Sequence, residues 1–286
     1  MAFYDKLRDR LEGKMPGKSV RLLPRSYQIV GRVLILRLKP QLLRYRKTIG
    51  EAVVHMLPYV HVVCLEKDIE GITRKPKIEI IAGCKEHQPA PSTQTLHKEY
   101  GCEFLLDVSE IMWSKGNKEE RQRIVKLVKP GEVVVDMFCG IGYFSIFIAK
   151  YCNPKKMYAI DINPKALEYL RKNVWFNKVE DRIEILEGDN RKFAGYLEEV
   201  ADRIIMGYLR KTELILPVAL RMLRKNGMIH LHRAVKAEDR KKVGERIIRI
   251  GKKNKCNIEI LGVKTVKSFA PRIYHLVYDL KVEKNV

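Results

Sequence analysis

Residues 133–142 read VVVDMFCGIG, in which three valines run into an acid and then into a Gly-x-Gly turn. β-branched residues favour a buried strand, and glycine lets the backbone turn tightly and approach a ligand closely. The segment therefore predicts a strand that ends in a ligand-binding turn, followed by a helix over 143–152. It lacks a third glycine at the dinucleotide spacing, which argues against NAD as the ligand.

Strand patterns alternate with helix patterns after this turn. Strands are predicted at 155–163, 182–190, 201–209 and 227–235, and helices at 164–177, 213–223 and 237–253. Such alternation is typical of βαβ units in a mostly parallel sheet. Two last strands, 257–268 and 272–282, are separated by only three residues and should pair antiparallel at one end of the sheet. The fold class is α/β, with a Rossmann-like domain over 116–286.

The preceding region has a different pattern and predicts a small α+β domain over 21–115. Its predicted elements are a strand from Gln28 through IVGRVLILRL, a helix at 40–57, strands at 60–66, 75–83 and 103–109, and a polar loop at 87–95. Residues 1–20 carry alternating charges with Gly and Pro and predict a short helix and a linker. A helix at 117–128 begins the Rossmann-like domain.

Polar residues follow three successive strands of the predicted parallel sheet. Gly140 lies in the first turn, Asp161 closes the second strand, and Asp189 and Asn190 close the third. Parallel strands end at one edge of the sheet, where ligands bind in open α/β folds. Asp161 is placed to accept both ribose hydroxyls of an adenosine, and Asp189 or Asn190 to bond the adenine amine. Alternatively, Asp161 only caps the next helix, and Gly188-Asp189-Asn190 is an ordinary turn.

The fourth strand leads into Gly207 and Tyr208, where a transferase would hold its acceptor. Gly207 would make room for a base and Tyr208 would stack on it. The alternative is an ordinary strand end with a half-buried tyrosine.

The charge balance favours a polyanionic partner. Lys and Arg total 56 against 34 acids, a formal net charge of +22, and nucleic acid would relieve the resulting self-repulsion. The alternative is a lysine-rich surface of a thermophilic protein. The basic residues Arg37, Lys39, Arg44, Arg46 and Lys47 either contact phosphate or form a solvated helix face.

Composition also bears on location and cysteine chemistry. No run of about 18 apolar residues predicts a membrane span, and the charged N-terminal segment has no secretory pattern. We therefore expect a cytoplasmic protein. Its six cysteines have no zinc-site spacing. Free thiols are expected, and a Cys84–Cys102 disulfide is left open.

Several motifs resemble a known family of transferases. DMFCGIGYFSIFIAK (136–150), AIDINPKALEYLRKN (159–173) and EGDNRKF (187–193) resemble the class I methyltransferase core. Together with RSYQIVG (25–31), IGEAVV (49–54) and HKEYGCEFLLDVSEIMWS (97–114), they resemble the tRNA guanosine-37 N1-methyltransferases. The likeness extends over about residues 20–280. It implies S-adenosylmethionine as co-substrate and no metal, with Ser114 and Arg121 near the methionine arm.

Two departures from those methyltransferases point to a sister family. They have Asn-Pro-Pro where this chain has Met206-Gly207-Tyr208, and an arginine where it has Gly116. Both changes resemble the tRNA wybutosine-synthesizing protein 2 family. That resemblance implies transfer of the 3-amino-3-carboxypropyl group of S-adenosylmethionine to C7 of 4-demethylwyosine in the anticodon loop of tRNA-Phe.

Two other functions stay open. One is N1-methylation of tRNA guanosine-37, and the other is non-catalytic RNA binding on a methyltransferase scaffold. The sequence identifies no general base and indicates no obligate protein partner. If the protein is the aminocarboxypropyltransferase, Gly116, Gly207 and Tyr208 form the pocket for the acceptor base.

Overall fold

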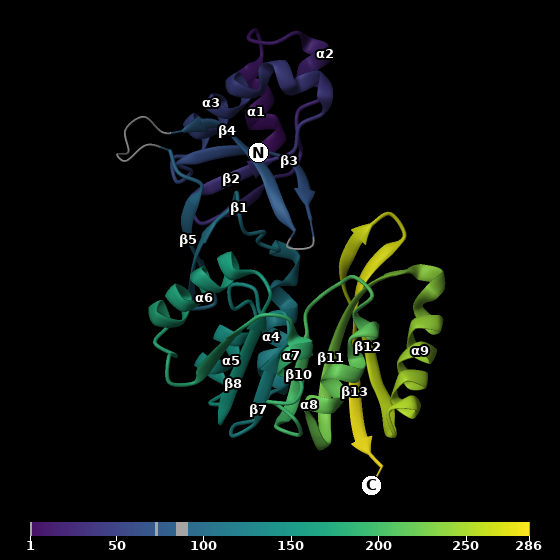
Figure 1. The fold of residues 1–286 in the computed structure, drawn as a ribbon. Helices are drawn as coiled ribbons and strands as arrows, with labels where there is room; N and C mark the ends of the chain where they lie inside the picture. The colour runs from purple at the N-terminus through teal and green to yellow at the C-terminus, as the bar shows by residue number, and fades with distance from the viewer. Residues whose placement is uncertain (1, 72–73, 84–90, 286) are drawn as a thin grey trace. The chain divides into compact units, whose positions relative to one another are not determined.

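The structure, a computed structural model, describes residues 2–71, 74–83 and 91–285. The chain divides into two units, Met1–Lys115 and Gly116–Val286 (Figure 1). Among the described residues, no helix combines the length and apolarity needed to cross a bilayer.

Unit 1 is an α+β unit in which helices cover a four-stranded sheet. The sheet order is β1-β2-β3-β4, with β2 and β3 parallel and the other pairs antiparallel, and β5 pairs with β6 in a separate hairpin. Its elements are α1 (Phe3–Leu11), α2 (Gly17–Val20), β1 (Gln28–Val30), β2 (Val33–Leu36), η1 (Pro40–Tyr45), α3 (Arg46–Met56), β3 (Val62–Glu70), β4 (Lys75–Gly83), β5 (Gln94–Glu99) and β6 (Cys102–Asp107).

The N-terminal segment belongs to the core of unit 1. The charge pattern of residues 1–20 predicts a helix and a linker outside the α+β domain. In the structure, Leu7 and Leu11 of α1 are completely buried in one cluster with Leu34 and Ile49. The apolar face of α1 is therefore part of the hydrophobic core that folds this unit.

The predicted single strand after Gln28 is a hairpin of β1 and β2. Gly31 lies at the turn with φ +54°, and a Cβ there would come within 2.2 Å of the Thr95 hydroxyl oxygen. The Arg32 amide donates to that hydroxyl at 3.0 Å. β5, which carries Thr95, was not predicted because its sequence, QTLHKE, contains a single apolar residue, Leu96.

Unit 2 has a seven-stranded sheet in the order β12-β13-β11-β10-β7-β8-β9. The five neighbouring strands β9, β8, β7, β10 and β11 are parallel. At the other end of the sheet, β13 pairs antiparallel with both β11 and β12, so the predicted antiparallel pair of last strands is confirmed. Its elements are η2 (Lys115–Asn117, at the boundary), α4 (Lys118–Leu127), β7 (Val133–Asp136), α5 (Ser145–Tyr151), β8 (Lys156–Asp161), α6 (Pro164–Phe176), β9 (Ile183–Glu187), α7 (Asn190–Phe193), β10 (Ala201–Met206), η3 (Thr212–Leu214), α8 (Leu216–Met222), β11 (Leu223–Lys236), η4 (Ala237–Asp239), α9 (Arg240–Lys253), β12 (Cys256–Ala270) and β13 (Ile273–Lys284).

The chain reverses direction across this sheet between β7 and β10. It winds outward from β7 to β9 and then returns to place β10 on the other side of β7. Right-handed crossovers put the helices before and after such a reversal on opposite faces. In open α/β sheets, ligands generally bind in a crevice outside the carboxyl ends of the two strands at such a reversal.

Buried and partly buried polar side chains connect β10, β11 and β13 of unit 2 to one another; we call this group the cross-strand network. The Arg203 guanidinium donates to Glu132 at 2.7 Å and contacts the His230 Nε2 at 2.7 Å. The His230 Nδ1 lies 2.6 Å from Asp279, which also accepts from Arg123 at 2.7 Å. Burial lowers the pKa of His230, which favours the neutral ring, although the contact with Asp279 opposes this shift. The network, completed by Glu120 beside Arg123, ties α4 to β10, β11 and β13.

The described cysteines Cys64, Cys139, Cys152 and Cys256 are buried thiols outside any disulfide. Burial raises the pKa of Cys64 to about 12, so this thiol stays protonated at neutral pH. Cys84 lies outside the described residues, so the Cys84–Cys102 disulfide stays open.

Candidate active site

The ends of β7, β8 and β9 are hydrogen-bonded to one another. The Gly140 amide donates to Asp161 Oδ2 at 2.7 Å, and the Gly188 amide donates to the Asp161 carbonyl oxygen at 2.9 Å. The structure thus brings together the three predicted strand ends. We call this group of Gly140, Asp161, Asp189 and Asn190 the carboxyl edge.

Asp161 connects two loops of the carboxyl edge. Its second carboxylate oxygen, Oδ1, accepts from the Asn163 amide at 2.9 Å, so the side chain orders its own loop as well as the glycine turn. Burial raises the pKa of Asp161, although these amide hydrogen bonds oppose the rise. Each carboxylate oxygen has two acceptor sites, so capacity remains for two ribose hydroxyls.

The glycine turn packs tightly behind this acid. A Cβ at Gly140, where φ is +56°, would come within 2.5 Å of the Tyr143 ring. A Cβ at Gly142 would come within 2.8 Å of Ile146 and Leu170. Gly142 therefore allows α5 and α6 to pack together, and Gly140 leaves room for the Tyr143 ring.

Asp189 and Asn190 differ in their surroundings. Asp189 accepts from the Arg191 amide at 2.9 Å as the cap of α7, and its carboxylate pairs with the Arg191 side chain. This pairing lowers the pKa of Asp189. Asn190 is 6% exposed, and its side-chain oxygen has no hydrogen-bond partner among the described residues. A buried acceptor without a donor fits a ligand amine, such as that of adenine.

Asp136, at the end of β7, is completely buried behind the glycine turn. It accepts from the Ser145 hydroxyl at 2.9 Å and from the Phe138 amide at 3.3 Å. Burial raises the pKa of Asp136 to about 7. Sequence reasoning noted this acid only as the end of the strand, although an acid inside a run of apolar residues signals a buried polar contact.

The end of β10 lies beside the glycine turn. A Cβ at Gly207 would lie 3.5 Å from the Phe144 ring and 3.9 Å from the Phe138 carbonyl oxygen. The Tyr208 ring is stacked on Phe138, with ring centroids 5.3 Å apart. The two residues predicted for the acceptor are thus next to the loop that carries Gly140.

Arg121 and Gly116 occupy different environments in unit 2. Arg121 on α4 is 1% exposed, so its side chain is buried and does not lie on the surface of the helix. Gly116 is exposed, and a Cβ there would come within 2.5 Å of the Lys267 side chain from β12. Ser114 belongs to unit 1.

Sequence reasoning missed a pair of buried histidines near Phe144. His232 contacts the Phe144 ring edge-on, with centroids 5.3 Å apart, and its Nδ1 lies 2.9 Å from the His275 Nε2. Burial lowers the pKa of His275 to about 4. The alternation in IHLHRAV predicts the strand, but it does not show which face is covered.

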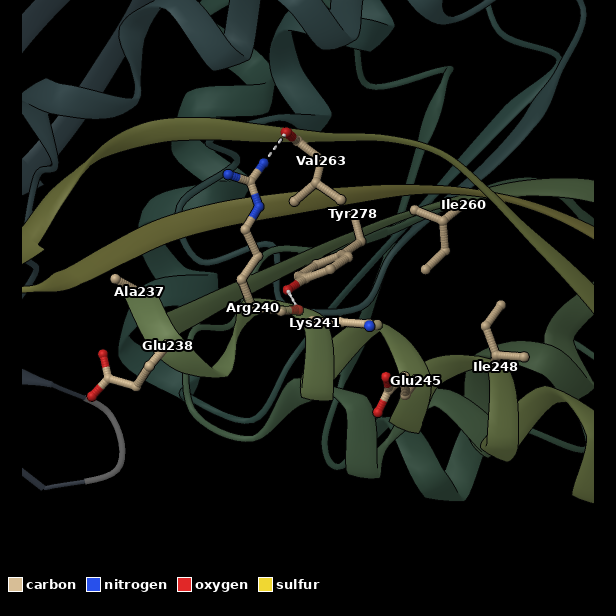
Figure 2. A pocket seen from close by; sticks show the side chains of 10 residues that line it. Ala237, Glu238, Arg240, Lys241, Glu245, Ile248, Ile260, Val263 and Tyr278 are labelled. Carbon is tan, nitrogen blue, oxygen red and sulfur yellow. Dashed lines mark hydrogen bonds between the residues drawn. The ribbon is translucent and has the colours of Figure 1, made fainter.

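The α9 groove is a separate cavity of about 680 Å³ in unit 2, between α9 and the strands β12 and β13. In Figure 2 the Tyr278 hydroxyl donates to the Arg240 carbonyl oxygen, and the Arg240 side chain reaches Val263. None of its lining residues belongs to the carboxyl edge. Within the described ranges, no group of three or more potential ligands is arranged to hold a metal ion.

A parallel sheet that reverses at β7 and β10, with a glycine turn and an acid at its carboxyl edge, defines the class I methyltransferase fold. Comparison with known proteins narrows this class. Residues 95–259 match the TRM5/TYW2 methyltransferase domain, and residues 7–86 match the TYW2 N-terminal domain. The chain belongs to the TYW2 family, to which Trm5 is the sister group.

Three relatives illustrate this membership. A Pyrococcus horikoshii protein named tRNA(Phe) (4-demethylwyosine(37)-C(7)) aminocarboxypropyltransferase is 39% identical over 98% of this chain and 97% of its own. The structure of P. horikoshii TYW2 in complex with MeSAdo has a TM-score of 0.86 at 36% identity, covering 99% and 100% of the two chains. The complex of aTrm5 and tRNALeu has a TM-score of 0.79 at 33% identity, covering 100% of this chain and 80% of that one.

Proposed function

We propose that this protein transfers the 3-amino-3-carboxypropyl group of S-adenosylmethionine to C7 of 4-demethylwyosine at position 37 of tRNA-Phe, in the cytoplasm. The observation that carries the proposal is the match along 98% of the chain to the P. horikoshii enzyme named for this reaction. The carboxyl edge supports it by offering acceptors for an adenosine, and the net charge of +22 suits a tRNA substrate.

The reaction is a displacement at the γ-carbon of the methionine arm. C7 of the base forms a bond to this carbon, the carbon–sulfur bond breaks, and its electron pair stays on sulfur, which leaves methylthioadenosine. The proton on C7 then goes to a base. The sulfonium carries three carbons, so orientation decides which one reacts. The protein's task is therefore to hold the adenosine fixed and to direct the arm toward the acceptor.

The carboxyl edge would fix the adenosine. Asp161 binds the ribose hydroxyls with the acceptor sites that Gly140 and Asn163 leave. Asn190 accepts from the adenine amine because its oxygen is buried without a donor among the described residues. Asp189, paired with Arg191, orients this loop from the cap of α7.

The methionine arm and the acceptor base would lie toward α4 and β10. By family resemblance, Ser114 and Arg121 hold the arm. A guanidinium offers five N–H donors, so Arg121 can bond a carboxylate in addition to protein groups. Gly207 leaves space beside Phe144, and Tyr208 offers the base the ring face that Phe138 does not cover. Gly116 completes this acceptor pocket.

Product analysis tests the function. The protein is incubated with S-adenosylmethionine and tRNA-Phe bearing 4-demethylwyosine, and both products are measured by mass spectrometry. We expect methylthioadenosine in proportion to tRNA that has gained an aminocarboxypropyl group. S-adenosylhomocysteine in proportion to methylated tRNA would establish a methyltransferase instead. Binding of cofactor and tRNA with neither product would indicate a non-catalytic RNA-binding protein.

A further inference from the structure

Unit 1 contains a cavity that the proposed reaction does not use. Its volume is about 660 Å³, and its lining comes from the segment before β1, from β2 and the residues after it, from β3 and from Lys115. Five cations line it, namely Arg21, Arg25, Arg37, Lys39 and Lys115, against the single acid Glu66. We call it the basic groove.

The cations of the basic groove are poorly compensated. Arg37 donates to Glu66 at 2.7 Å, and its side chain is 74% exposed. Arg25 lies over the Tyr4 ring, 5.1 Å from its centroid. The other three cations form no ion pair with any residue that the structure describes; they are Arg21, Lys39 and Lys115. The excess positive charge in a concave surface attracts an anion.

The α9 groove in unit 2 shows that a cavity of this size need not be basic. Its charged residues are Glu238 and Glu245 against Arg240 and Lys241, so the charges balance (Figure 2). The two cavities have similar volumes, about 680 and 660 Å³. The positive charge of the chain is therefore not shared equally between these two cavities, and the basic groove has an excess of cations over acids.

We propose that the basic groove binds backbone phosphates of the tRNA substrate. Guanidinium groups match phosphate oxygens in a paired geometry, and lysines add point charges. Glu66 holds one edge of Arg37 and leaves the remaining donors of this exposed side chain for the RNA. The proposal rests on the proposed function for the identity of the RNA, while the groove itself rests on the charges around it.

A phosphate-rich RNA fits this surface better than an anionic membrane. Stable membrane binding needs exposed apolar side chains that insert beside the charges. The apolar lining residues Leu22 and Ile35 are only partly exposed, and Leu23 is buried. The groove is concave, and its cations come from several segments, as contact with a folded backbone requires.

Two matched double variants test the groove. Arg21→Gln with Lys39→Gln removes two exposed groove cations. Arg44→Gln with Lys47→Gln removes the same residue types from η1 and α3 of the same unit, outside the groove. Fluorescence anisotropy of labelled tRNA-Phe at several KCl concentrations measures Kd and its salt dependence. Calorimetry with S-adenosylmethionine checks that unit 2 stays folded.

We expect the groove variant to raise Kd about tenfold and to reduce the slope of log Kd against log salt by about 0.7–0.9 for each phosphate that the protein no longer neutralises. The η1–α3 variant should change Kd less than about twofold, and cofactor affinity should be unchanged in both variants.

Equal weakening of tRNA binding by both pairs of substitutions, or no weakening by the groove pair, overturns the proposal. The proposal is also overturned if the groove variant binds phosphatidylserine vesicles more weakly than the wild type does but binds tRNA-Phe with unchanged affinity. Failure of wild-type protein to make the aminocarboxypropyl product would overturn the proposed function and leave these binding results intact.

Discussion

The carboxyl edge and the cross-strand network both hold carboxylates, but they surround them differently. Asp161 accepts hydrogen bonds from backbone amides of two loops. Asp279 accepts from the side chains of Arg123 and His230, which come from two other elements. Asp161 accepts two such bonds, one on each oxygen, and keeps acceptor sites for a ligand. Asp279 accepts three, two from Arg123 and one from His230, and keeps fewer. The first arrangement serves binding, and the second holds the strands together.

Removing an acid from the network should therefore have the largest effect on stability. Asp279→Ala leaves the buried His230 and the partly buried Arg123 without their shared partner. We expect the free energy of unfolding of unit 2 to fall by about 3–5 kcal/mol, the range for breaking a buried ion pair. Urea denaturation followed by circular dichroism measures it.

Glu283→Ala is the matched control, because it lies on the same strand. Glu283 pairs with Lys281 at 3.2 Å, and both side chains are about half exposed. Its removal should cost less than about 1 kcal/mol. Similar costs for Asp279→Ala and Glu283→Ala would mean that the network does not hold the strands.

Removing an acid from the carboxyl edge should weaken cofactor binding. Asp161→Ala should lower the affinity for S-adenosylmethionine by about 1–3 kcal/mol, the range for hydrogen bonds to a charged group. Glu187→Ala is the control, since this acid ends the neighbouring strand and pairs with Arg171 on an exposed surface. Calorimetry that finds equal affinity in Asp161→Ala and wild type would remove Asp161 from the site.

Asp136 differs from both Asp161 and Asp279, because it accepts hydrogen bonds from one hydroxyl and one backbone amide and is completely buried. Its folded-state pKa of about 7 lies above the unfolded value near 3.9. The folded state thus binds the proton more tightly, so this contribution to stability is complete below about pH 4 and disappears as pH rises to about 7. Within that window the slope approaches about 1.4 kcal/mol per pH unit.

Asp136→Asn keeps the shape of the side chain and removes its titration. The difference in unfolding free energy, wild type minus variant, should therefore decrease steadily from pH 4 to pH 7. Subtracting the variant cancels the opposite pH dependence of acids with a lowered pKa, such as Asp189. A difference that stays constant over this range would show that Asp136 is ionised throughout.

The same contrast explains what the sequence could predict. The bonds from the Asn163 amide to Asp161 and from the Arg191 amide to Asp189 join residues two positions apart, and the strand-end pattern located both acids. The contact of Arg123 with Asp279 joins residues 156 positions apart. Local spacing carries no information about such a pair, because its partners meet only after the sheet has formed.

The fold, too, was predicted where local sequence patterns determine it and missed where contacts with other segments do. Alternating apolar segments predicted the parallel strands of unit 2 and the antiparallel pair at one end. The β1–β2 hairpin was missed because Gly31 turns inside a continuous apolar run, and β5 was missed because it is stabilised by polar contacts such as the Arg32 amide to Thr95. The basic residues at 37–47, which the sequence indicated as a candidate phosphate-binding cluster, lie in different environments. Arg46 pairs with Glu79, and only Arg37 and Lys39 line the basic groove.

The position of β13 has a consequence for how the protein is made. β13 follows β12 in the chain, yet it lies between β11 and β12 in the sheet. A ribosome releases the chain from its N-terminal side, so β12 emerges before there is a strand for it to pair with. During that interval β11 is an open edge, which invites pairing with other chains, and His230 still lacks Asp279. The synthesis of β13 therefore completes both the sheet and the hydrogen bonds of the cross-strand network in one step.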